Sequence, residues 1–366
     1  MLHSIPLASA QLGNLERKYL LEAFDSGFIS GAGPFVERFE HAFAKRIGTR
    51  FGVACSNGTA SLHLALKALG VGPGAEVIVP DLTYVATANA VTYCGARPVF
   101  ADVDPSTWCI SLETVEPLVT RRTMGIIPVH LYGQPCDVED LQGIADAHGL
   151  FILEDAAQAH GAHIYGKPVG SLGNASSFSF YGNKLVTTGE GGIICTDCED
   201  LAASMRALRG HCMDPERRYW FTDVGYNYRM PNLCAAVGLA QVEGLDAVLA
   251  HRTAIDSWYR EALAPLPVAL PPSRDWADDV CWLFSAVLQE EDDRDAVIES
   301  LRQSGIDSRP FFASLSTLPF HVEMAKYYPV PEHSRRLARC GLNLPTGPHV
   351  SREVVERVAG ALRAAL

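Results

Sequence analysis

The sequence lacks the features that would direct it to a membrane or a nucleic acid. No apolar run approaches the roughly 20 residues that span a bilayer, and the N-terminus has no basic start followed by a long apolar core. Lysine and arginine form no cluster, and the formal net charge is −12. We therefore expect a cytoplasmic protein with neither a nucleic-acid nor a membrane partner.

The sequence also lacks the patterns of a metalloprotein and of a nicotinamide-dependent dehydrogenase. Its 10 cysteines are irregularly spaced, and Cys195 and Cys198 have no second pair nearby, so we expect reduced thiols and no metal. A dinucleotide-binding turn would need GxGxxG after a strand. Gly31 and Gly33 follow no clear strand, and the third glycine is missing.

What remains is an ordinary globular composition with 48% apolar and 20% charged residues, long enough for two domains. Through the first two thirds, short apolar strands alternate with helical patterns. This alternation predicts an α/β fold with a mostly parallel sheet covered on both faces and ligands at the carboxyl ends of its strands. The expected strands are 51–55, 76–79, 98–103, 125–129, 150–153 and 192–196, and helices are expected at 59–68 and 138–148.

The last third has a different pattern. A helical segment at 241–264 leads into a proline-rich connection at 263–276, after which 280–289 is predicted to be a strand. Helices are predicted at 294–304, 337–342 and 352–366. We therefore predict a large domain at 1–245 and a smaller α+β domain at 246–366.

A carboxylate and an amide follow an apolar strand in the motif EDAAQAHG, residues 154–161. Asp155 is expected to point into the ligand crevice and to keep a pyridine nitrogen protonated, and that charge pairing favours the carboxylate form. If a helix begins here, Gln158 points the same way and can donate to a phenolic oxygen. The competing interpretation is that Asp155 only caps that helix.

A lysine lies in the glycine-rich segment SFSFYGNKLVTTGEGG, residues 177–192. Lys184 is expected to have a lowered pKa near an electropositive cofactor, and thus to supply a free amine. Ser179 precedes it by five residues and can bond a phosphate oxygen. A lone lysine is usually a solvated charge, but a lysine and a carboxylate in this arrangement fit pyridoxal phosphate, which needs a covalent anchor and a protonated ring nitrogen.

Two other turns favour the same cofactor. Gly58 and Thr59 open an amphipathic helix whose first amides are free to bind an anion. Tyr84 follows another predicted strand, where its ring can stack on a flat ligand or pack in the core.

A basic and aromatic segment precedes an alanine-rich helix that begins after residue 230. Arg218, Tyr219 and Trp220 can grip a nucleotide through phosphate pairing and base stacking, or form a solvated loop. Asn227 and Arg229 can each contact an anion. The small residues of the helix suit close helix packing or a subunit contact.

Taken in order, these motifs resemble the DegT/DnrJ/EryC1/StrS family of sugar aminotransferases, which depend on pyridoxal phosphate, and the resemblance covers essentially the whole chain. It implies the fold type I aminotransferase architecture, with a large, mostly parallel seven-stranded sheet, and a homodimer with shared active sites. The roles it implies are covalent attachment and acid/base action for Lys184, pairing with the ring nitrogen for Asp155, a bond to the phenolic oxygen for Gln158, ring stacking for Tyr84, phosphate binding for Gly58, Thr59 and Ser179, and phosphate binding from the neighbouring subunit for Asn227.

Within the family, the segments MDPERRYW, PVHLYGQPCD and GLAQVE are similar to those of enzymes that form GDP-perosamine. That similarity implies L-glutamate as amino donor and GDP-4-keto-6-deoxy-D-mannose as acceptor. Ser316 stands near a position at which members of the group often have a histidine. The alternatives are a dTDP- or UDP-linked keto sugar, a sugar dehydratase using the same cofactor, and a protein that binds the cofactor without catalysis.

Overall fold

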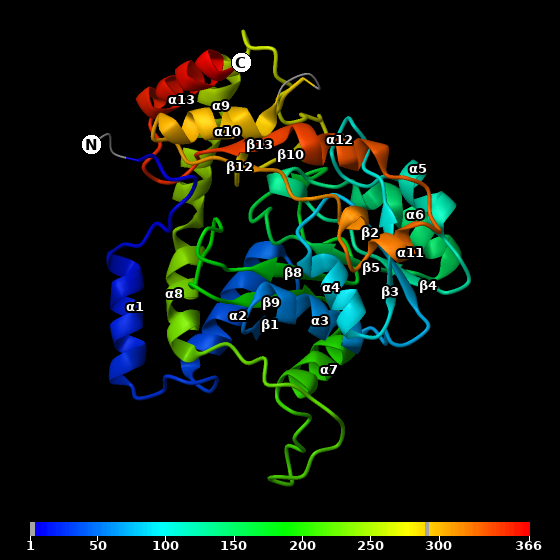
Figure 1. Ribbon diagram of the computed structural model, residues 1–366. Coiled ribbons are helices and arrows are strands. Elements are labelled where there is room, and N and C mark those ends of the chain that lie inside the picture. The colour runs from blue at the N-terminus through cyan, green and yellow to red at the C-terminus, as the bar shows by residue number, and fades with distance from the viewer. Residues whose placement is uncertain (1–3, 290–292) are drawn as a thin grey trace.

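A seven-stranded sheet forms the centre of the computed structural model, which describes residues 4–289 and 293–366 (Figure 1). The strands lie in the order β1-β9-β8-β5-β4-β2-β3. Strand β9 runs antiparallel to both neighbours, and the other pairs are parallel. The bounds are β1 (Phe51–Cys55), β2 (Glu76–Pro80), β3 (Arg97–Ala101), β4 (Thr123–Ile126), β5 (Phe151–Asp155), β8 (Ala175–Ser179) and β9 (Gly192–Thr196). The predicted α/β class with a mostly parallel sheet is confirmed.

Helices cover both faces of this sheet. One face packs against α3 (Gly58–Ala68), α4 (Ala86–Tyr93) and α7 (Glu199–Arg209). The opposite face carries a second apolar core that includes side chains of α2 (Pro34–Ile47), α6 (Val138–His148) and α8 (Asn232–Glu243). Successive residues of β5 alternate between the two cores, with Ile152 in one and Leu153 in the other, because side chains of a strand point to opposite faces in turn.

Helix α8 packs beside α1 (Asn14–Asp25) and α2. A Cβ atom on Gly238 would lie 2.8 Å from the Phe39 ring, so α8 approaches α2 closely because of its small residues. The close helix packing expected from the sequence therefore takes place within one chain.

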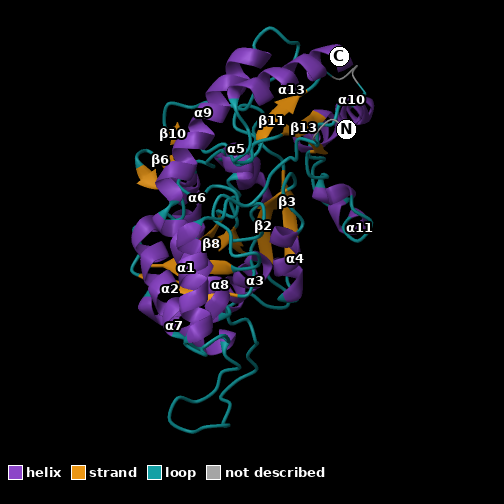
Figure 2. Cartoon of the chain, turned by 90° about the vertical axis from the view of Figure 1, so that its left-hand side faces the viewer, coloured by secondary structure: helices purple, strands orange, loops and turns teal. Residues whose placement is uncertain are grey.

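The last third of the chain builds a second sheet with its own core around Tyr259, Phe284 and Leu301. Figure 2 shows β11, β13, α10 and α13 of this part of the chain at the top of the molecule, above the large sheet. The elements are α9 (Leu245–Leu263), β11 (Phe284–Val287), α10 (Arg294–Gln303), β12 (Arg309–Pro310), α11 (Val322–Ala325), α12 (Glu332–Cys340), β13 (Gly341–Leu344) and α13 (Arg352–Ala365). The division of the chain at residue 245 stays a prediction.

The prediction of a helix at 337–342 was partly wrong. Residues 341 and 342 begin β13, which pairs with β11 and β12, and the helix before it ends at Cys340. A short apolar run fits a buried strand as well as a helix end, so periodicity alone does not separate the two. The remaining short elements are α5 (Leu112–Val115), β6 (His163–Ile164), β7 (Lys167–Pro168), β10 (Ala277–Asp278) and the 3₁₀ turns η1 (Glu116–Leu118), η2 (Leu131–Gly133) and η3 (Leu315–Thr317).

Within the described residues, no single helix has both the length and the apolar character needed to cross a bilayer. The consecutive helices α8 and α9 reach that threshold only when taken together, across a 61° bend.

Candidate active site at the carboxyl end of the sheet

The residues predicted to bind the cofactor lie where neighbouring strands end. Asp155 closes β5 and pairs with Ser177 of β8. Ser179 closes β8 and pairs with Gly192, which in turn pairs with Cys55 at the end of β1. Strands β1, β8 and β5 run in the same direction, so their carboxyl ends meet at one edge. A ligand crevice is expected at such an edge.

A tight turn at the start of α3 forms a cradle of closely approaching backbone. The Asn57 side chain accepts a hydrogen bond from Ala60 N at 2.8 Å and thereby caps the helix. A Cβ atom on Gly58 would lie 3.0 Å from Ser179 Oγ, and one on Gly192 would lie 2.6 Å from the Asn57 carbonyl carbon. The glycines thus allow the amides of Gly58 and Thr59 and a serine hydroxyl to converge, an arrangement that fits a phosphate group.

Asp155 is buried with both carboxylate oxygens occupied. One accepts a hydrogen bond from Thr87 Oγ1 at 2.8 Å, and the other from Ala157 N at 3.2 Å. Burial raises the pKa of this carboxyl group, while these two bonds and the charge of Lys184 oppose the rise. A protonated ring nitrogen beside Asp155 would also lower the pKa of its carboxyl group. The environment therefore fits a carboxylate with a cationic partner.

No helix begins at Asp155, so the capping interpretation is wrong. Residues 156–162 form turns, and the carboxylate bonds an amide only two residues ahead. The helical spacing invoked for Gln158 is also wrong. Instead, Gln158 Oε1 accepts a hydrogen bond from Tyr132 N at 2.8 Å. This bond fixes the orientation of the amide and leaves its NH₂ group to donate elsewhere, as contact with a phenolic oxygen would require.

Lys184 lies in a turn that follows β8, and its N–H donates to the Tyr181 carbonyl at 2.9 Å. Burial lowers the pKa of the Lys184 amine to about 7, and Asp155 acts in the opposite direction. The sequence predicted a lowered pKa but attributed it to a positive neighbour, whereas desolvation is the main cause here. Lys184 Nζ lies 3.6 Å from the centroid of the Trp282 ring, a residue to which the sequence gave no functional signal.

Glu154, next to Asp155, has a different role. It is fully buried and accepts hydrogen bonds from three amides of the turn at 170–173 and from His130. His130 Nδ1 accepts from Cys136 N at 3.0 Å, so its Nε2 carries the proton that is donated to Glu154. This network holds two loops beneath the site, and Glu154 is not available to a ligand.

Tyr84 follows β2 and is 56% exposed, so the core interpretation of this residue is wrong. Its ring centroid lies 5.6 Å from that of Phe312, which stacks on Tyr132 at 5.1 Å. Asp81 holds the neighbouring segment by accepting hydrogen bonds from the Ser314 hydroxyl and from Ser316 N.

Ser316 is itself buried. Its backbone N–H donates to Asp81, so Ser316 helps to hold this segment to the end of β2.

The residues predicted to bind a nucleotide lie outside the body of the protein, away from β8 and the turn that follows it. After α7 the chain forms a long loop that projects from the body of the protein (Figures 1 and 2). The guanidinium carbon of Arg217 lies 4.3 Å from the centroid of the Trp220 ring, and that of Arg218 lies 5.0 Å from the centroid of the Tyr219 ring. Both aromatic rings are exposed. The structure thus brings Arg218, Tyr219 and Trp220 together with one another, not with the cofactor residues.

Asn227 and Arg229 follow that loop and are exposed beside the end of β1. Arg229 Nε donates to Asn227 Oδ1 at 3.3 Å, and the Arg229 backbone pairs with Cys55. They lie near the edge of the sheet that carries the cradle, on its outer side.

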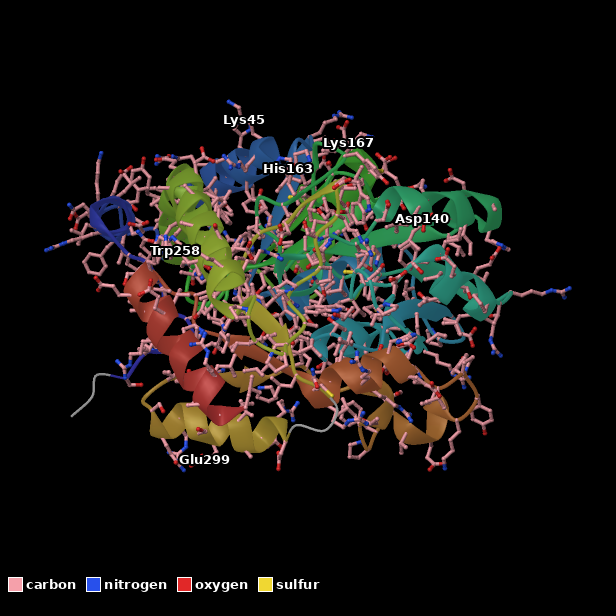
Figure 3. All side chains as sticks on the ribbon, turned by 90° about the horizontal axis from the view of Figure 1, so that it is seen from above. Lys45, Asp140, His163, Lys167, Trp258 and Glu299 are labelled. Atoms are coloured by element: carbon pink, nitrogen blue, oxygen red, sulfur yellow. The ribbon has the colours of Figure 1, made fainter. Side chains whose placement is uncertain are left out.

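A basic hollow on another face of the protein does not compete with this site. Figure 3 shows Lys45, His163 and Lys167 along one margin of the molecule. Arg46, which lines the hollow with Lys45 and His163, bonds Asp246 at 2.5 Å, and Lys167 bonds Glu139 at 2.7 Å. One of the two cationic side chains that line the hollow is thus already paired with a carboxylate.

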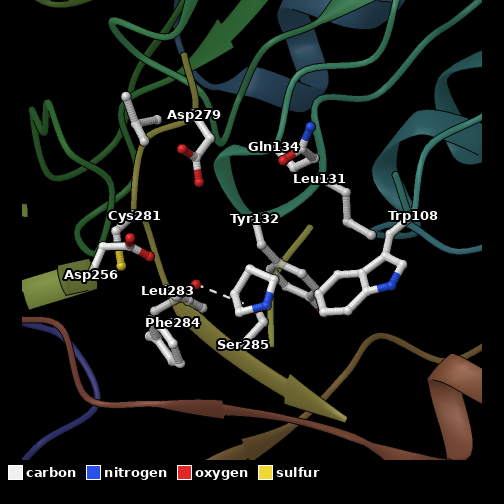
Figure 4. A pocket seen from close by; sticks show the side chains of 12 residues that line it. Trp108, Leu131, Tyr132, Gln134, Asp256, Asp279, Cys281, Leu283, Phe284 and Ser285 are labelled. Atoms are coloured by element: carbon white, nitrogen blue, oxygen red, sulfur yellow. Dashed lines mark hydrogen bonds between the residues drawn. The ribbon is translucent and has the colours of Figure 1, made fainter. Parts of the chain in front are cut away.

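An enclosed cavity lies behind Tyr132, lined on one side by Trp108 and on the other by Asp256 and Asp279 (Figure 4). Its volume of about 20 Å³ is enough for one water molecule and too small for a sugar nucleotide. The edge of the sheet at which Asp155 and Ser179 lie is therefore the better candidate for substrate.

Comparisons with known proteins agree with this geometry. The DegT/DnrJ/EryC1/StrS aminotransferase family matches residues 10–363. The chain is 47% identical over 365 residues to a GDP-perosamine synthase of Caulobacter vibrioides, covering 98% of this chain and 97% of that protein. Its fold matches DesI in the presence of its TDP-sugar product, with a TM-score of 0.92 and 34% identity over 100% of this chain and 93% of that chain.

It also matches the PMP-form of the sugar aminotransferase Spr1654 from Streptococcus pneumoniae. That match has a TM-score of 0.93 and 25% identity over 99% of this chain and 98% of the other.

Proposed function

Because the chain belongs to the DegT/DnrJ/EryC1/StrS aminotransferase family, we propose that it transfers the amino group of L-glutamate to a GDP-linked keto sugar. The acceptor is the C4 ketone of GDP-4-keto-6-deoxy-D-mannose, and the products are GDP-perosamine and 2-oxoglutarate. The observation that carries this choice is the 47% identity to a GDP-perosamine synthase over nearly the full length of both chains. The match to a TDP-sugar enzyme is weaker in sequence, at 34%.

Pyridoxal phosphate, the cofactor of this family, fits the residues present. We assign its phosphate to the cradle of Gly58, Thr59 and Ser179, where the amides and hydroxyl converge. We assign its ring nitrogen to Asp155 and its phenolic oxygen to the free NH₂ group of Gln158. When bound, the cofactor supplies an electron sink that stabilises negative charge at the carbon from which a proton is removed.

The chain supplies positioning and proton transfer. Lys184 anchors the cofactor and, once released, takes a proton at Nζ from one carbon and returns it to another. A pKa of about 7 suits both tasks, because the amine then gains and loses a proton near neutral pH. Thr87 and the Ala157 amide fix the Asp155 carboxylate, which would pair with the ring nitrogen. Tyr84 keeps an exposed face on which a flat ring can stack.

A second copy of the chain completes the proposed site. Exposed apolar side chains gather on and after α1, including Leu21, Phe24 and Phe28, and an apolar surface of this kind is typical of a subunit contact. The projecting loop carries Arg218, Tyr219 and Trp220 away from its own Lys184, so we assign these residues, with Asn227 and Arg229, to the active site of the neighbouring subunit. A cytoplasmic location remains part of the proposal.

The two rival functions lack support in the residues. A dehydratase related to this family would carry a histidine at the position of Lys184, and a cofactor-binding protein without turnover would not need a lysine there. Lys184 is present, with a carboxylate and an amide in place.

The test is a product assay with purified enzyme, pyridoxal phosphate, L-glutamate and GDP-4-keto-6-deoxy-D-mannose. We expect GDP-perosamine and 2-oxoglutarate in equal amounts by chromatography and mass spectrometry. The same assay with dTDP- and UDP-linked 4-keto sugars serves as the comparison. If sustained 2-oxoglutarate formation requires a dTDP- or UDP-linked sugar, the acceptor assignment is wrong. If none of the three sugars supports it, the proposed transfer is wrong.

A further inference from the structure

The free side chain of Lys184 rests on the face of an aromatic ring. Its Nζ lies 3.6 Å from the centroid of the Trp282 ring, which is close for a cation and an indole. The negative face of an indole attracts an ammonium group, and the attraction is greater when water is excluded. Trp282 is 3% exposed, so this contact is shielded from water.

The indole is fixed to the same turn that carries the lysine. Trp282 Nε1 donates to the carbonyl of Asn183 at 2.8 Å, and Asn183 directly precedes Lys184. The Trp282 carbonyl accepts a hydrogen bond from Thr346 Oγ1 at 2.7 Å, and the ring stacks on Tyr132 with centroids 6.2 Å apart. A ring held on both sides keeps its face toward the lysine.

Other groups act on the amine and do not replace this contact. Asp155 favours the ammonium from the end of β5, and burial opposes it. His160, in the turn that follows β5, is neutral because its pKa is lowered to about 3 by burial and by Lys184. None of these groups is at hydrogen-bonding distance from Nζ among the contacts of the described residues, whereas the indole face is in direct contact.

We propose that Trp282 is a positioning residue, and that its indole face is the resting place of the Lys184 ammonium whenever the lysine is not joined to the cofactor. This inference rests on the proposed amino transfer, in which Lys184 is covalently engaged for part of the cycle and free for the rest. A long, flexible side chain loses conformational entropy each time it returns to a reactive position. A fixed aromatic platform limits that loss and favours the protonated state that the amine needs as an acid.

The test measures the protonation of Lys184 without cofactor or sugar. Acetic anhydride acylates only the neutral amine, so the acetylation rate of the Lys184 peptide, followed by mass spectrometry across a pH series, reports its titration midpoint. In Trp282→Leu the ammonium loses its platform, and we expect the midpoint to fall by about one pH unit, a tenfold change. Trp282→Phe keeps an aromatic face, so we expect a smaller fall of the midpoint, of about half a pH unit, which is a threefold change in the acid dissociation constant.

Trp258→Phe, on α9, is the matched control and should leave the midpoint unchanged. Circular dichroism shows whether each variant is folded. An unchanged midpoint in Trp282→Leu would overturn the proposal, and if that variant does not fold, an unchanged midpoint in Trp282→Phe decides against it. Because no sugar or cofactor is present, a wrong acceptor assignment cannot produce either result, and the product assay reports that failure separately.

Discussion

The buried carboxylate of Asp81 accepts a hydrogen bond from the hydroxyl of Ser314, a residue from the other end of the chain. Burial raises the pKa of Asp81, and the bonds from Ser314 and Ser316 oppose that rise. This contact holds the segment that places Phe312 against Tyr84. It therefore connects the end of β2 to the segment that carries Phe312.

Replacing Asp81 should destabilise the fold and weaken substrate binding. In Asp81→Ala the Ser314 hydroxyl and the Ser316 amide lose a buried acceptor, at a cost of roughly 1–3 kcal/mol in the free energy of unfolding. Urea unfolding measures this loss. We also expect a larger rise in KM for the keto sugar than for glutamate, because Phe312 and Tyr84 lose their relative position. The exposed Asp200→Ala should change neither quantity.

Removing the amine of Lys184 should abolish amino transfer without unfolding the chain. Lys184→Ala leaves the Tyr181 turn and β8 intact, since the bond to Tyr181 comes from the backbone. The assay is 2-oxoglutarate release over many turnovers, with circular dichroism as the folding check and the exposed Lys45→Ala as the control. Continued multiple turnover in Lys184→Ala would contradict the role assigned to this residue.

Neutralising Asp155 should slow the reaction through the cofactor. In Asp155→Asn the ring nitrogen loses its anionic partner, and we expect at least a tenfold lower kcat, equivalent to about 1.4 kcal/mol. Thr87→Val removes only one of the hydrogen bonds to the carboxylate, so its effect should be smaller. The absorbance spectrum of the bound cofactor across pH should change in parallel. A normal rate in Asp155→Asn would mean that another group protonates the ring.

His160 should make the protein sensitive to acid. Its pKa is lowered to about 3, so between about pH 6.5 and 3 the unfolded chain binds a proton that the folded chain does not. The free energy of unfolding therefore falls as pH falls, by up to about 1.4 kcal/mol per unit from this group. His160→Leu should flatten that dependence in urea titrations between pH 7 and 5. The exposed His148→Asn should not.

Shared active sites predict complementation between two inactive variants. Lys184→Ala and Asn227→Ala, mixed after partial unfolding, should form hybrid dimers in which one site has both native residues. Activity should then recover toward about a quarter of the wild-type level. No recovery, despite hybrid dimers seen by native mass spectrometry, would place Asn227 in the site of its own chain.

Much of the cofactor site was predictable because its residues follow strands in short motifs. Asp155 and Gly58 follow strands that the alternation of strands and helices already indicated, whereas Ser179 was recognised from its distance of five residues from Lys184, because β8 was not among the expected strands. Trp282 gave no such signal, and Asp81, although it follows β2, was not recognised because its partners Ser314 and Ser316 lie far along the sequence. Trp282 meets the lysine turn from a position 99 residues away from Asn183, and a tryptophan in an apolar segment has the same pattern whether it packs in a core or supports an amine.

The projecting loop was predictable in composition but not in place. The sequence indicated cations beside aromatic rings at 217–220, and the structure pairs them in that way. Its distance from Lys184 depends on the path of the chain after α7, which no local pattern specifies. The helix predicted after Asp155 was wrong for a related reason. Gln158 bonds Tyr132, a residue from another segment, and the spacing of residues 155 and 158 alone does not reveal that contact.

The neighbouring carboxylates at the end of β5 show how strand register sets the chemistry of this edge. Glu154 and Asp155 point to opposite sides. Glu154 accepts hydrogen bonds from loop amides and His130, whereas Asp155 accepts one bond at each oxygen, from Thr87 and Ala157. A shift of β5 by a single residue would exchange the two carboxylates, because side chains alternate along a strand. The pairing of Asp155 with Ser177 therefore decides which of the two acids faces the candidate site, so the backbone hydrogen bonds of the sheet select the carboxylate that is placed there.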